Sequence, residues 1–254
     1  MVQLLEQQEY EVERGDRLGN IPNPVDYVFD IAAYGNYYDQ TDENEAWNIN
    51  LHRVRYMLEQ LDEIDYKAAV FTGTSAVYLK TKTPYIASKS KMETIVAVKR
   101  QRDDAPLATI RPYTIYGVGD TKHLIPIVFD SCINQTPMIL DPKPIHDYVW
   151  VEDVAQAYIT VAKDIKERKA CAVEVGTGIG TSNEDVVHMI EEITGKKANI
   201  TGHKKLRHYD ENNKDREYYW SMREGVDTDI KSTYKLMDGL KEIYEKQGFE
   251  KKDN

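Results

Sequence analysis

Short apolar runs give way to helical patterns three times in the first half of this chain, and this alternation constrains the fold more than any other feature. The runs are DYVFDIAA (26–33), AAVFTGTSAVY (68–78) and LATIRPYTIYG (107–117), and helical patterns follow near 43–62, from Pro84 onward and near 121–135. Strands that alternate with helices form parallel sheets with helices on their faces, and strands buried on both faces are continuous apolar runs. The sequence therefore predicts an α/β fold built on a parallel sheet.

The second half has a different pattern. Short strands and amphipathic helices with longer connections follow in TPMIL (136–140), DYVWVEDVAQAYITVAKDI (147–165), CAVEVGTG (171–178) and SNEDVVHMIEEITG (182–195). We interpret this half as a smaller α/β lobe, so the predicted domains are residues 1–117 and 118–254.

Composition excludes several classes of protein. The chain has 254 residues, enough for one large or two joined domains, and a net charge of -10, which argues against nucleic acid as a partner. No apolar run is long enough to span a bilayer, and the first residues are too polar for a signal peptide. Cys132 and Cys171 have no metal-binding spacing and imply no disulfide framework, so we expect no metal site and a cytoplasmic location.

The carboxyl ends of the predicted strands carry small and polar residues, and this edge is where parallel sheets bind ligands. A helix beginning at Pro84 starts on the same side, with Tyr85 and Lys89 one turn apart on one face. Two interpretations fit this pair alone. Lys89 is either a solvated side chain that covers Tyr85, or a cation that acts on its phenol.

Several motifs then occur in an order that resembles the extended short-chain dehydrogenase/reductase family of nucleotide-sugar epimerases and dehydratases. They are FDIAAYG, NINLHRVRYMLEQ with Asn50, FTGTSAVY, PYIASKSKMET, IRPYTIYGVGD, IHDYVWVEDVAQA and EVGTGIGTSNEDVV, which together cover residues 26 to about 190. The resemblance implies a Rossmann-like parallel sheet for the dinucleotide in the first domain and a substrate-binding lobe in the second.

The resemblance also implies a catalytic set of Tyr85, Lys89 and Thr74. A free phenol has a pKa of about 10 and is a poor base at neutral pH, and a nearby lysine cation is expected to lower that pKa. Tyr85 would then take a proton from a sugar hydroxyl, Thr74 would hydrogen-bond the same oxygen, and Lys89 would also hold the nicotinamide ribose. The alternative for Thr74 is a strand-end hydroxyl bonded to local backbone.

Further ligand contacts follow from the same motifs. The resemblance implies NAD as the cofactor, with a nucleotide-sugar as substrate and a homodimer left open. The cofactor-binding positions are Asp16, Ala32, Ala33, Tyr85, Lys89 and Pro112, and the substrate-binding positions are Tyr34, Asn36, Tyr113 and His146. The carboxylate of Asp16 favours NAD over NADP because it accepts hydrogen bonds from free ribose hydroxyls and repels a 2′-phosphate.

The chain departs from the family pattern at its beginning. Only fifteen residues precede Asp16, and they hold no G-x-x-G-x-x-G turn, which lies roughly 20 residues before the ribose acid. LLEQQEYEV is interpreted as the end of a first helix followed by a second strand, and only LKTKTP separates Tyr78 from Tyr85. Without the glycine-rich turn the pyrophosphate has no helix N-terminus, so this chain alone is expected to bind NAD poorly.

A second glycine-rich stretch, GTGIGT (176–181), lies between a strand and a helix. It is interpreted as a turn and helix start, with Thr181 and Glu184 at capping-box spacing, rather than as a phosphate loop. His146 stands where the family has an arginine, and it is either a weak phosphate ligand or a surface histidine. HKKLRH (203–208) is interpreted as a solvated charge run and Asp153 as a helix cap.

The function predicted from this pattern is an NAD-dependent epimerase or dehydratase acting on a nucleotide-linked sugar. Two alternatives remain open because of the missing turn. One is a cofactor-free relative that serves as a binding or partner subunit, and the other is an NAD-independent enzyme that uses Tyr85 only as an acid or base.

Overall fold

The structure is a computed structural model that describes residues 1–37, 39–79, 83–203, 219–220, 230, 232 and 234–247. It contains two compact units. Met1–Pro112 and Val154–Val175 form most of the first unit, and the second consists of Tyr113–Asp153 with much of the chain after Val175. The predicted division of roles between residues 1–117 and 118–254 stays a prediction.

The first unit is built on a parallel sheet of four strands in the order β1-β2-β3-β7. They are β1 (Tyr27–Asp30), β2 (Ala68–Thr72), β3 (Leu107–Pro112) and β7 (Ala172–Val175). The register pairs Phe29 with Val70 and Val70 with Ala108, so the three apolar runs of the first half lie side by side. This confirms the predicted α/β fold with a Rossmann-like sheet.

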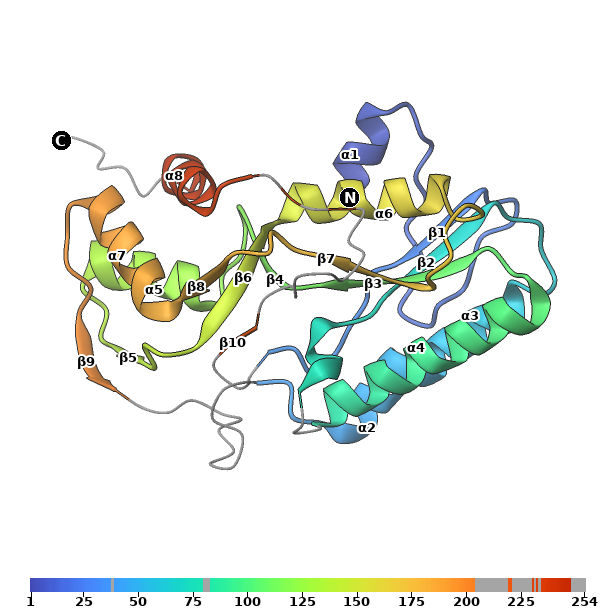
Figure 1. The fold of residues 1–254 in the computed structure, drawn as a ribbon, viewed down its shortest axis with the longest axis horizontal. Coiled ribbons are helices and arrows are strands. Elements are labelled where there is room, and N and C mark those ends of the chain that lie inside the picture. Colours follow the sequence, from blue (N-terminus) through green and yellow to red (C-terminus); the bar gives the residue numbers. More distant parts are fainter. Residues whose placement is uncertain are drawn as a thin grey trace. The chain divides into compact units, whose positions relative to one another are not determined.

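Helices cover both faces of this sheet, which is why its strands are apolar throughout. Figure 1 shows α3 (Arg53–Gln60) and α4 (Pro84–Asp103) on one face and α6 (Val151–Lys163) on the other. In β1, Val28 packs in the cluster that holds Met92 of α4, whereas the ring of Phe29 meets the edge of Tyr158 of α6 at 6.3 Å between centroids. Successive strand residues point to opposite faces, so each face needs its own apolar side chains.

The helix α4 begins at Pro84, as its sequence predicts. Thr83 caps it by accepting a hydrogen bond from the Ile86 N–H, and Pro84 occupies the first turn, where no N–H partner is needed. The helix ends where Asp104 adopts a left-handed conformation. Tyr85 therefore stands in the first turn, and its position is fixed by local sequence as well as by packing.

The rest of the first unit consists of short elements. They are α1 (Val2–Gln7), α2 (Glu43–Trp47), a π-helical segment η1 (Asn48–His52) and a 3₁₀ helix η2 (Ser75–Tyr78). The helix predicted near 43–62 is thus formed by α2, η1 and α3 in succession. The strand expected after the first helix does not form, because residues 10–16 pair with no strand among the described residues.

The strand β7 (Ala172–Val175), from the segment 171–178 that the sequence analysis assigned to the second lobe, belongs to the first unit, whereas residues 176–178 belong to the second. β7 pairs in parallel with β3, with Val173 opposite Ile110 and Val175 opposite Pro112. Three of its four residues are buried, as in the other strands of the sheet. The chain leaves the sheet after β3 and returns to it in β7, after α6. A single domain boundary in the sequence cannot describe a unit whose chain returns in this way.

The second unit contains two small sheets and three helices. β4 (Thr114–Tyr116), β6 (Ile145–Trp150), β8 (Gly180–Ser182) and β10 (Tyr219–Trp220) form one sheet, and β5 (Met138–Leu140) pairs with β9 (Ile200–His203). The helices are α5 (Leu124–Asn134), α7 (Asn183–Thr194) and α8 (Leu236–Lys246).

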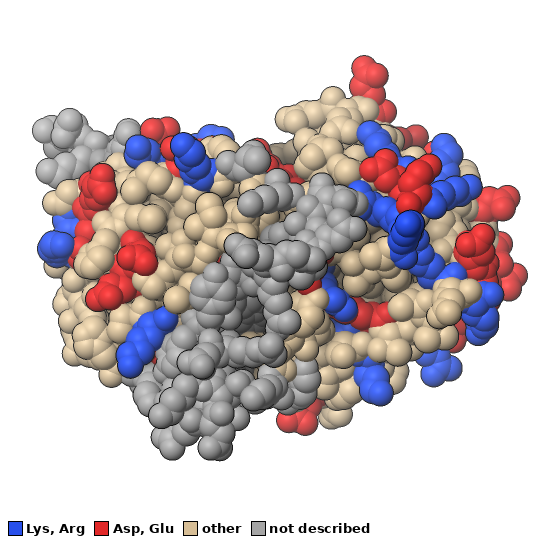
Figure 2. Space-filling model, in the orientation of Figure 1, with Lys and Arg blue, Asp and Glu red and all other residues tan. Residues whose placement is uncertain are grey.

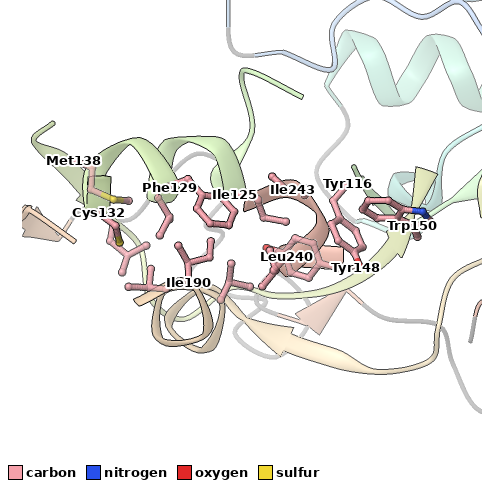
Figure 3. Close-up of a cluster of buried hydrophobic side chains, with 14 residues drawn as sticks. Tyr116, Ile125, Phe129, Cys132, Met138, Tyr148, Trp150, Ile190, Leu240 and Ile243 are labelled. Atoms are coloured by element: carbon pink, nitrogen blue, oxygen red, sulfur yellow. The ribbon is translucent and has the colours of Figure 1, made fainter. Parts of the chain in front are cut away.

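The core of the second unit is aromatic at one end and contains sulfur-bearing side chains at the other. Figure 3 shows Tyr116, Tyr148 and Trp150 gathered together, whereas Cys132 and Met138 lie at the other end of the cluster. The rings of Tyr116 and Trp150 meet at 68° with 5.2 Å between centroids. Aromatic pairs favour such tilted contacts. The rings on these strands therefore pack in a defined geometry within the apolar core.

Two findings concern partners. None of the helices in the described part of the chain is both long and apolar enough to cross a membrane. Acidic and basic side chains of the described residues are interspersed on the face shown in Figure 2, without a basic stripe.

Candidate active site

Three of the predicted residues come together at the carboxyl edge of the parallel sheet. Thr74 follows β2, and Tyr85 and Lys89 lie one turn apart on α4. Thr74 lies close enough to the Tyr85 phenol for hydrogen bonding to lower the pKa of Tyr85 in part. The hydroxyl of Thr74 accepts a hydrogen bond from the Ala76 N–H at 3.2 Å, which is the local backbone bond of the alternative interpretation, and its bond to a substrate oxygen stays a prediction.

Lys89 is fully buried, which contradicts the interpretation of a solvated lysine covering a tyrosine. Its Nζ donates hydrogen bonds to the carbonyl oxygens of Thr72 (2.8 Å) and Ala32 (3.2 Å). The cation thereby joins the ends of β1 and β2. Burial lowers the pKa of Lys89 to about 8, and the nearby carboxylate of Asp30 partly opposes this shift.

The expected effect of Lys89 on Tyr85 is wrong for this structure. The pKa of Tyr85 is raised, chiefly by burial, and the hydrogen bond from Thr74 only partly opposes that shift. The physical reason is that the ammonium group points to two carbonyls and Asp30, and desolvation of the phenolate outweighs any attraction to it. Tyr85 is therefore a protonated phenol at neutral pH.

The turn after β1 is held against Tyr85 by an amide that the sequence analysis noted only as part of a motif. The side chain of Asn50 accepts the Tyr34 N–H at 2.9 Å and donates to the Tyr34 carbonyl at 2.8 Å and the Ser88 hydroxyl at 3.0 Å. Gly35 has a φ of +100°, and a Cβ there would lie 2.9 Å from the Cβ of Tyr85. The glycine is thus required by both backbone conformation and contact.

Asp16, Ala32, Ala33 and Tyr34 line one pocket of about 220 Å³, as expected of residues that bind one ligand. Sequence reasoning missed three further lining residues, Arg17, Ile49 and Arg53. Arg53 is buried and pairs with Asp30 at the end of β1. A buried arginine paired with a distant acid leaves no local sequence signal, so this contact could not be found by spacing.

Asp16 is held by its own loop. Its carboxylate accepts hydrogen bonds from the N–H groups of Gly19 (2.8 Å) and Asn20 (3.0 Å) and from the Asn20 side chain (2.5 Å). These bonds, led by that of the Asn20 side chain, lower the pKa of Asp16. The Leu18 N–H adds a further hydrogen bond that lowers the pKa of Asp16, so the loop itself uses the acceptor positions of this carboxylate.

The remaining predicted ligand contacts are distributed differently. Pro112 is buried at the end of β3, where its carbonyl accepts a hydrogen bond from the Ser75 hydroxyl. Asn36 is exposed and is not among the residues that line the pocket. Tyr113 and His146 belong to the second unit. Their contacts with a substrate, like that of Tyr34, stay predictions.

His146 is not a surface histidine. It lies half-buried in β6, where its Nδ1 is 3.4 Å from the Thr114 hydroxyl, and burial lowers its pKa to about 4. The imidazole is neutral at physiological pH. It therefore lacks the positive charge with which an arginine would bind a diphosphate.

The glycine-rich stretch GTGIGT begins as the predicted turn, but Gly180 and Thr181 belong to β8 and not to the start of a helix. Two N–H groups of the turn are already used. The buried carboxylate of Asp147 accepts the N–H groups of Thr177 and Gly178, both at 2.8 Å, and the Thr177 hydroxyl at 2.6 Å. An anion of the protein occupies the place that a phosphate would need. This turn is therefore not a phosphate loop in the described structure.

Two predicted helix caps lie at other positions in the structure. The capping box of α7 is formed by Ser182 and Asp185, one residue later than the predicted Thr181 and Glu184. Asp153 lies inside the first turn of α6 rather than before it, and it accepts a hydrogen bond from the Ser232 hydroxyl. Most of HKKLRH (203–208) lies outside the described residues. No three His, Cys, Asp or Glu side chains in the described part gather to hold a metal ion.

Comparisons with known proteins agree with this geometry. The chain is 30% identical over 150 residues to CDP-abequose synthase of Salmonella typhimurium, covering 54% of this chain and 50% of that protein. It is 23% identical over 205 residues to an uncharacterized UDP-glucose epimerase, YtcB, of Bacillus subtilis, covering 72% and 63%. The chain thus spans about half to two thirds of the length of these curated relatives.

A solved structure, MoeE5 in complex with UDP-glucose and NAD, superposes with a TM-score of 0.81 at 20% identity, covering 97% of this chain and 94% of the other. At this identity the likeness shows the fold, which is that of a Rossmann-type sheet. Residues 6–176 match the sequence profile of the NAD dependent epimerase/dehydratase family. The match covers more than half of the chain, and the protein belongs to this family.

Proposed function

We propose that this chain acts as an NAD-dependent epimerase or dehydratase on a nucleotide-linked sugar, with Tyr85, Thr74 and Lys89 as its catalytic residues. One observation carries the proposal. At the carboxyl edge of the parallel sheet, Tyr85 and buried Lys89 lie one turn apart on α4, and Thr74 follows β2 close enough to the Tyr85 phenol to oppose part of the rise in its pKa. The names of the relatives support the substrate class, because they include a CDP-sugar and a UDP-sugar enzyme.

The residues present fit NAD at two places. The pocket lined by Asp16 and the Ala32–Ala33 turn has a carboxylate, which a ribose hydroxyl would reach by replacing one of its loop donors, and small side chains that allow close approach. Tyr85 and Lys89 would hold the nicotinamide ribose at the other place. NAD, when bound, supplies an acceptor for the hydride of the sugar carbon.

The side chains of this chain would handle the proton. Tyr85 takes the proton of the sugar hydroxyl at its phenol oxygen, and the Thr74 hydroxyl holds the oxygen that loses it. Because burial raises the pKa of Tyr85, the phenol must first release its own proton to solvent. The phenolate then accepts the proton of the sugar hydroxyl.

The test is a search for products. The purified protein is incubated with NAD and a panel of UDP- and CDP-linked hexoses, and proton NMR detects an epimer by its ring couplings or a dehydratase product by a new methyl signal. Tyr85→Phe is the active-site variant, and Tyr66→Phe, at the amino end of β2, is the matched control. Conversion by the Tyr66 variant and loss in the Tyr85 variant supports the proposal, whereas conversion by both contradicts it.

The finer predictions belong here as well. Sugar contacts from Tyr34, Asn36, Tyr113 and His146, a homodimer and a cytoplasmic location remain proposals. Both cysteines are free in the structure, which is compatible with a reducing compartment.

A further inference from the structure

Glu93 lies on the same face of α4 as the proposed catalytic residues, four residues after Lys89 and eight after Tyr85. Its side chain is buried, with 7% of the residue exposed. A buried carboxylate is unfavourable unless its oxygens are paired and hydrogen-bonded. The partners of Glu93 therefore indicate what holds it there.

One carboxylate oxygen faces the loop that carries Thr74. Oε1 of Glu93 accepts the Thr74 N–H at 3.2 Å. A Cβ on Gly73 would lie 2.2 Å from the same oxygen, so the loop approaches the carboxylate so closely that only glycine fits. The backbone on both sides of the Gly73–Thr74 peptide is thus shaped by this one oxygen.

The other oxygen is fixed from the sheet. Oε2 of Glu93 accepts two hydrogen bonds from Arg111 of β3, from Nε at 2.8 Å and from Nη2 at 2.6 Å. Arg111 also donates to the Tyr78 hydroxyl at 2.8 Å, and that hydroxyl donates to Glu174 of β7. Both guanidinium donors thus converge on Oε2, which leaves Oε1 directed to the Thr74 N–H.

We propose that Glu93 is a positioning residue, which fixes the backbone of Thr74 so that its hydroxyl meets the phenol of Tyr85, and that Arg111 fixes Glu93 in turn. The fixing of the Thr74 backbone by Glu93 stands on the hydrogen bonds alone. Its meaning for catalysis rests on the proposed function.

A second consequence follows from the charge. The carboxylate of Glu93 adds to burial in raising the pKa of Tyr85. The groups of the other packed elements that face this cluster are Thr74 after β2, Asp30 of β1 with its partner Arg53 of α3, Tyr158 of α6, and Lys89 on α4 itself. Removing the charge of Glu93 while these groups stay should therefore lower the pKa of Tyr85.

The test uses NMR and needs no substrate. Full-length protein carrying tyrosine labelled with ¹³C at Cζ is titrated with base, and the Tyr85 signal is identified by its loss in Tyr85→Phe. In Glu93→Gln the pKa of Tyr85 should fall, and the Thr74 amide proton should shift upfield because a neutral amide is the weaker acceptor. Glu59→Gln, which removes an exposed carboxylate on α3, should change neither signal.

An unchanged Thr74 amide shift and an unchanged Tyr85 titration in Glu93→Gln would overturn the inference. If that variant does not fold because Arg111 is left buried without its acid, the double variant Glu93→Gln/Arg111→Gln removes both charges and is judged by the same two signals. Absence of turnover in the wild type together with the expected shifts would remove the proposed function and leave the positioning role. Turnover with unchanged shifts would remove the positioning role alone.

Discussion

Two stretches of this chain have the sequence of a ligand site, and the structure treats them in opposite ways. In PYIASK, at the start of α4, the phenol of Tyr85 and the cation of Lys89 stand at a sheet edge beside a pocket. In GTGIGT the backbone donors are already bonded to the buried carboxylate of Asp147. The difference lies in the partners: Lys89 of the first stretch donates to two backbone carbonyls, whereas the donors of the second are bonded to a buried carboxylate that excludes an anion. Spacing in sequence does not reveal these partners.

The largest expected effect tests the first stretch. Tyr85→Phe removes one hydroxyl and should reduce the turnover rate by about 10²–10⁴, the usual contribution of a general base. The substrate affinity and the unfolding midpoint should change little, because the ring remains. Steady-state kinetics on the substrate found by the product search measure it. A rate equal to that of the wild type would place the chemistry elsewhere.

The second prediction concerns the other stretch and is measured as stability. Asp147→Ala leaves the Thr177 and Gly178 donors without an acceptor in a buried turn, which should lower the free energy of unfolding by about 3 kcal/mol. Urea denaturation measures the change, with Asp185→Ala, at the exposed capping box of α7, as a milder comparison of about 1 kcal/mol. Equal stability of Asp147→Ala and wild type, with new phosphate binding, would reverse our interpretation of GTGIGT.

The third prediction concerns the first stretch and uses the pH dependence of stability to test the burial of Lys89. Burial lowers the pKa of Lys89 from 10.5 to about 8, so between these values the unfolded chain holds a proton that the folded chain has released. Stability therefore rises with pH in this window. Relative to Lys89→Met, the wild type should gain roughly 2 kcal/mol between pH 7 and about pH 9.5.

Lys91→Met, an exposed lysine on the same helix, is the matched control for that experiment. A stability difference between wild type and Lys89→Met that stays constant with pH would mean that Lys89 is not strained by burial.

The smallest expected effect compares two glycines. Gly35 and Gly119 have φ values of +100° and +93°, but a Cβ on Gly35 would meet Tyr85, whereas one on Gly119 would meet nothing within 4 Å. Both alanine variants should lose about 1–2 kcal/mol of stability from the left-handed backbone. Only Gly35→Ala should also slow turnover, by about tenfold, since it displaces Tyr85. Equal rates in the two variants would show that the contact with Gly35 does not position Tyr85.

Local patterns predicted the elements well. The apolar runs identified β1, β2 and β3, and the Thr83–Pro84 start identified α4, since both depend on neighbours in sequence. The sequence analysis did not predict that β7 joins the sheet of the first unit. The pairing of β3 with β7 joins residues some 60 positions apart, and no local pattern encodes such a contact.

The candidate site was predictable in its membership and less so in its electrostatics. Thr74, Tyr85 and Lys89 come together as expected. The direction of the pKa shift of Tyr85 was wrong, because burial depends on packing from several elements. Arg53 and Glu93 were overlooked as site residues because their partners, Asp30 and Arg111, lie on strands distant in sequence.

The central claim is that the cluster around Tyr85 performs NAD-dependent chemistry on a nucleotide-sugar. Its most direct test is the fluorescence of reduced nicotinamide when the protein, saturated with NAD, is mixed with the nucleotide-sugar that it converts. We expect a transient signal in the wild type and in Tyr66→Phe at high NAD concentration, and none in Tyr85→Phe, although calorimetry should show that this variant binds NAD as weakly as the wild type. Conversion of the sugar at an undiminished rate after NAD has been removed would contradict it.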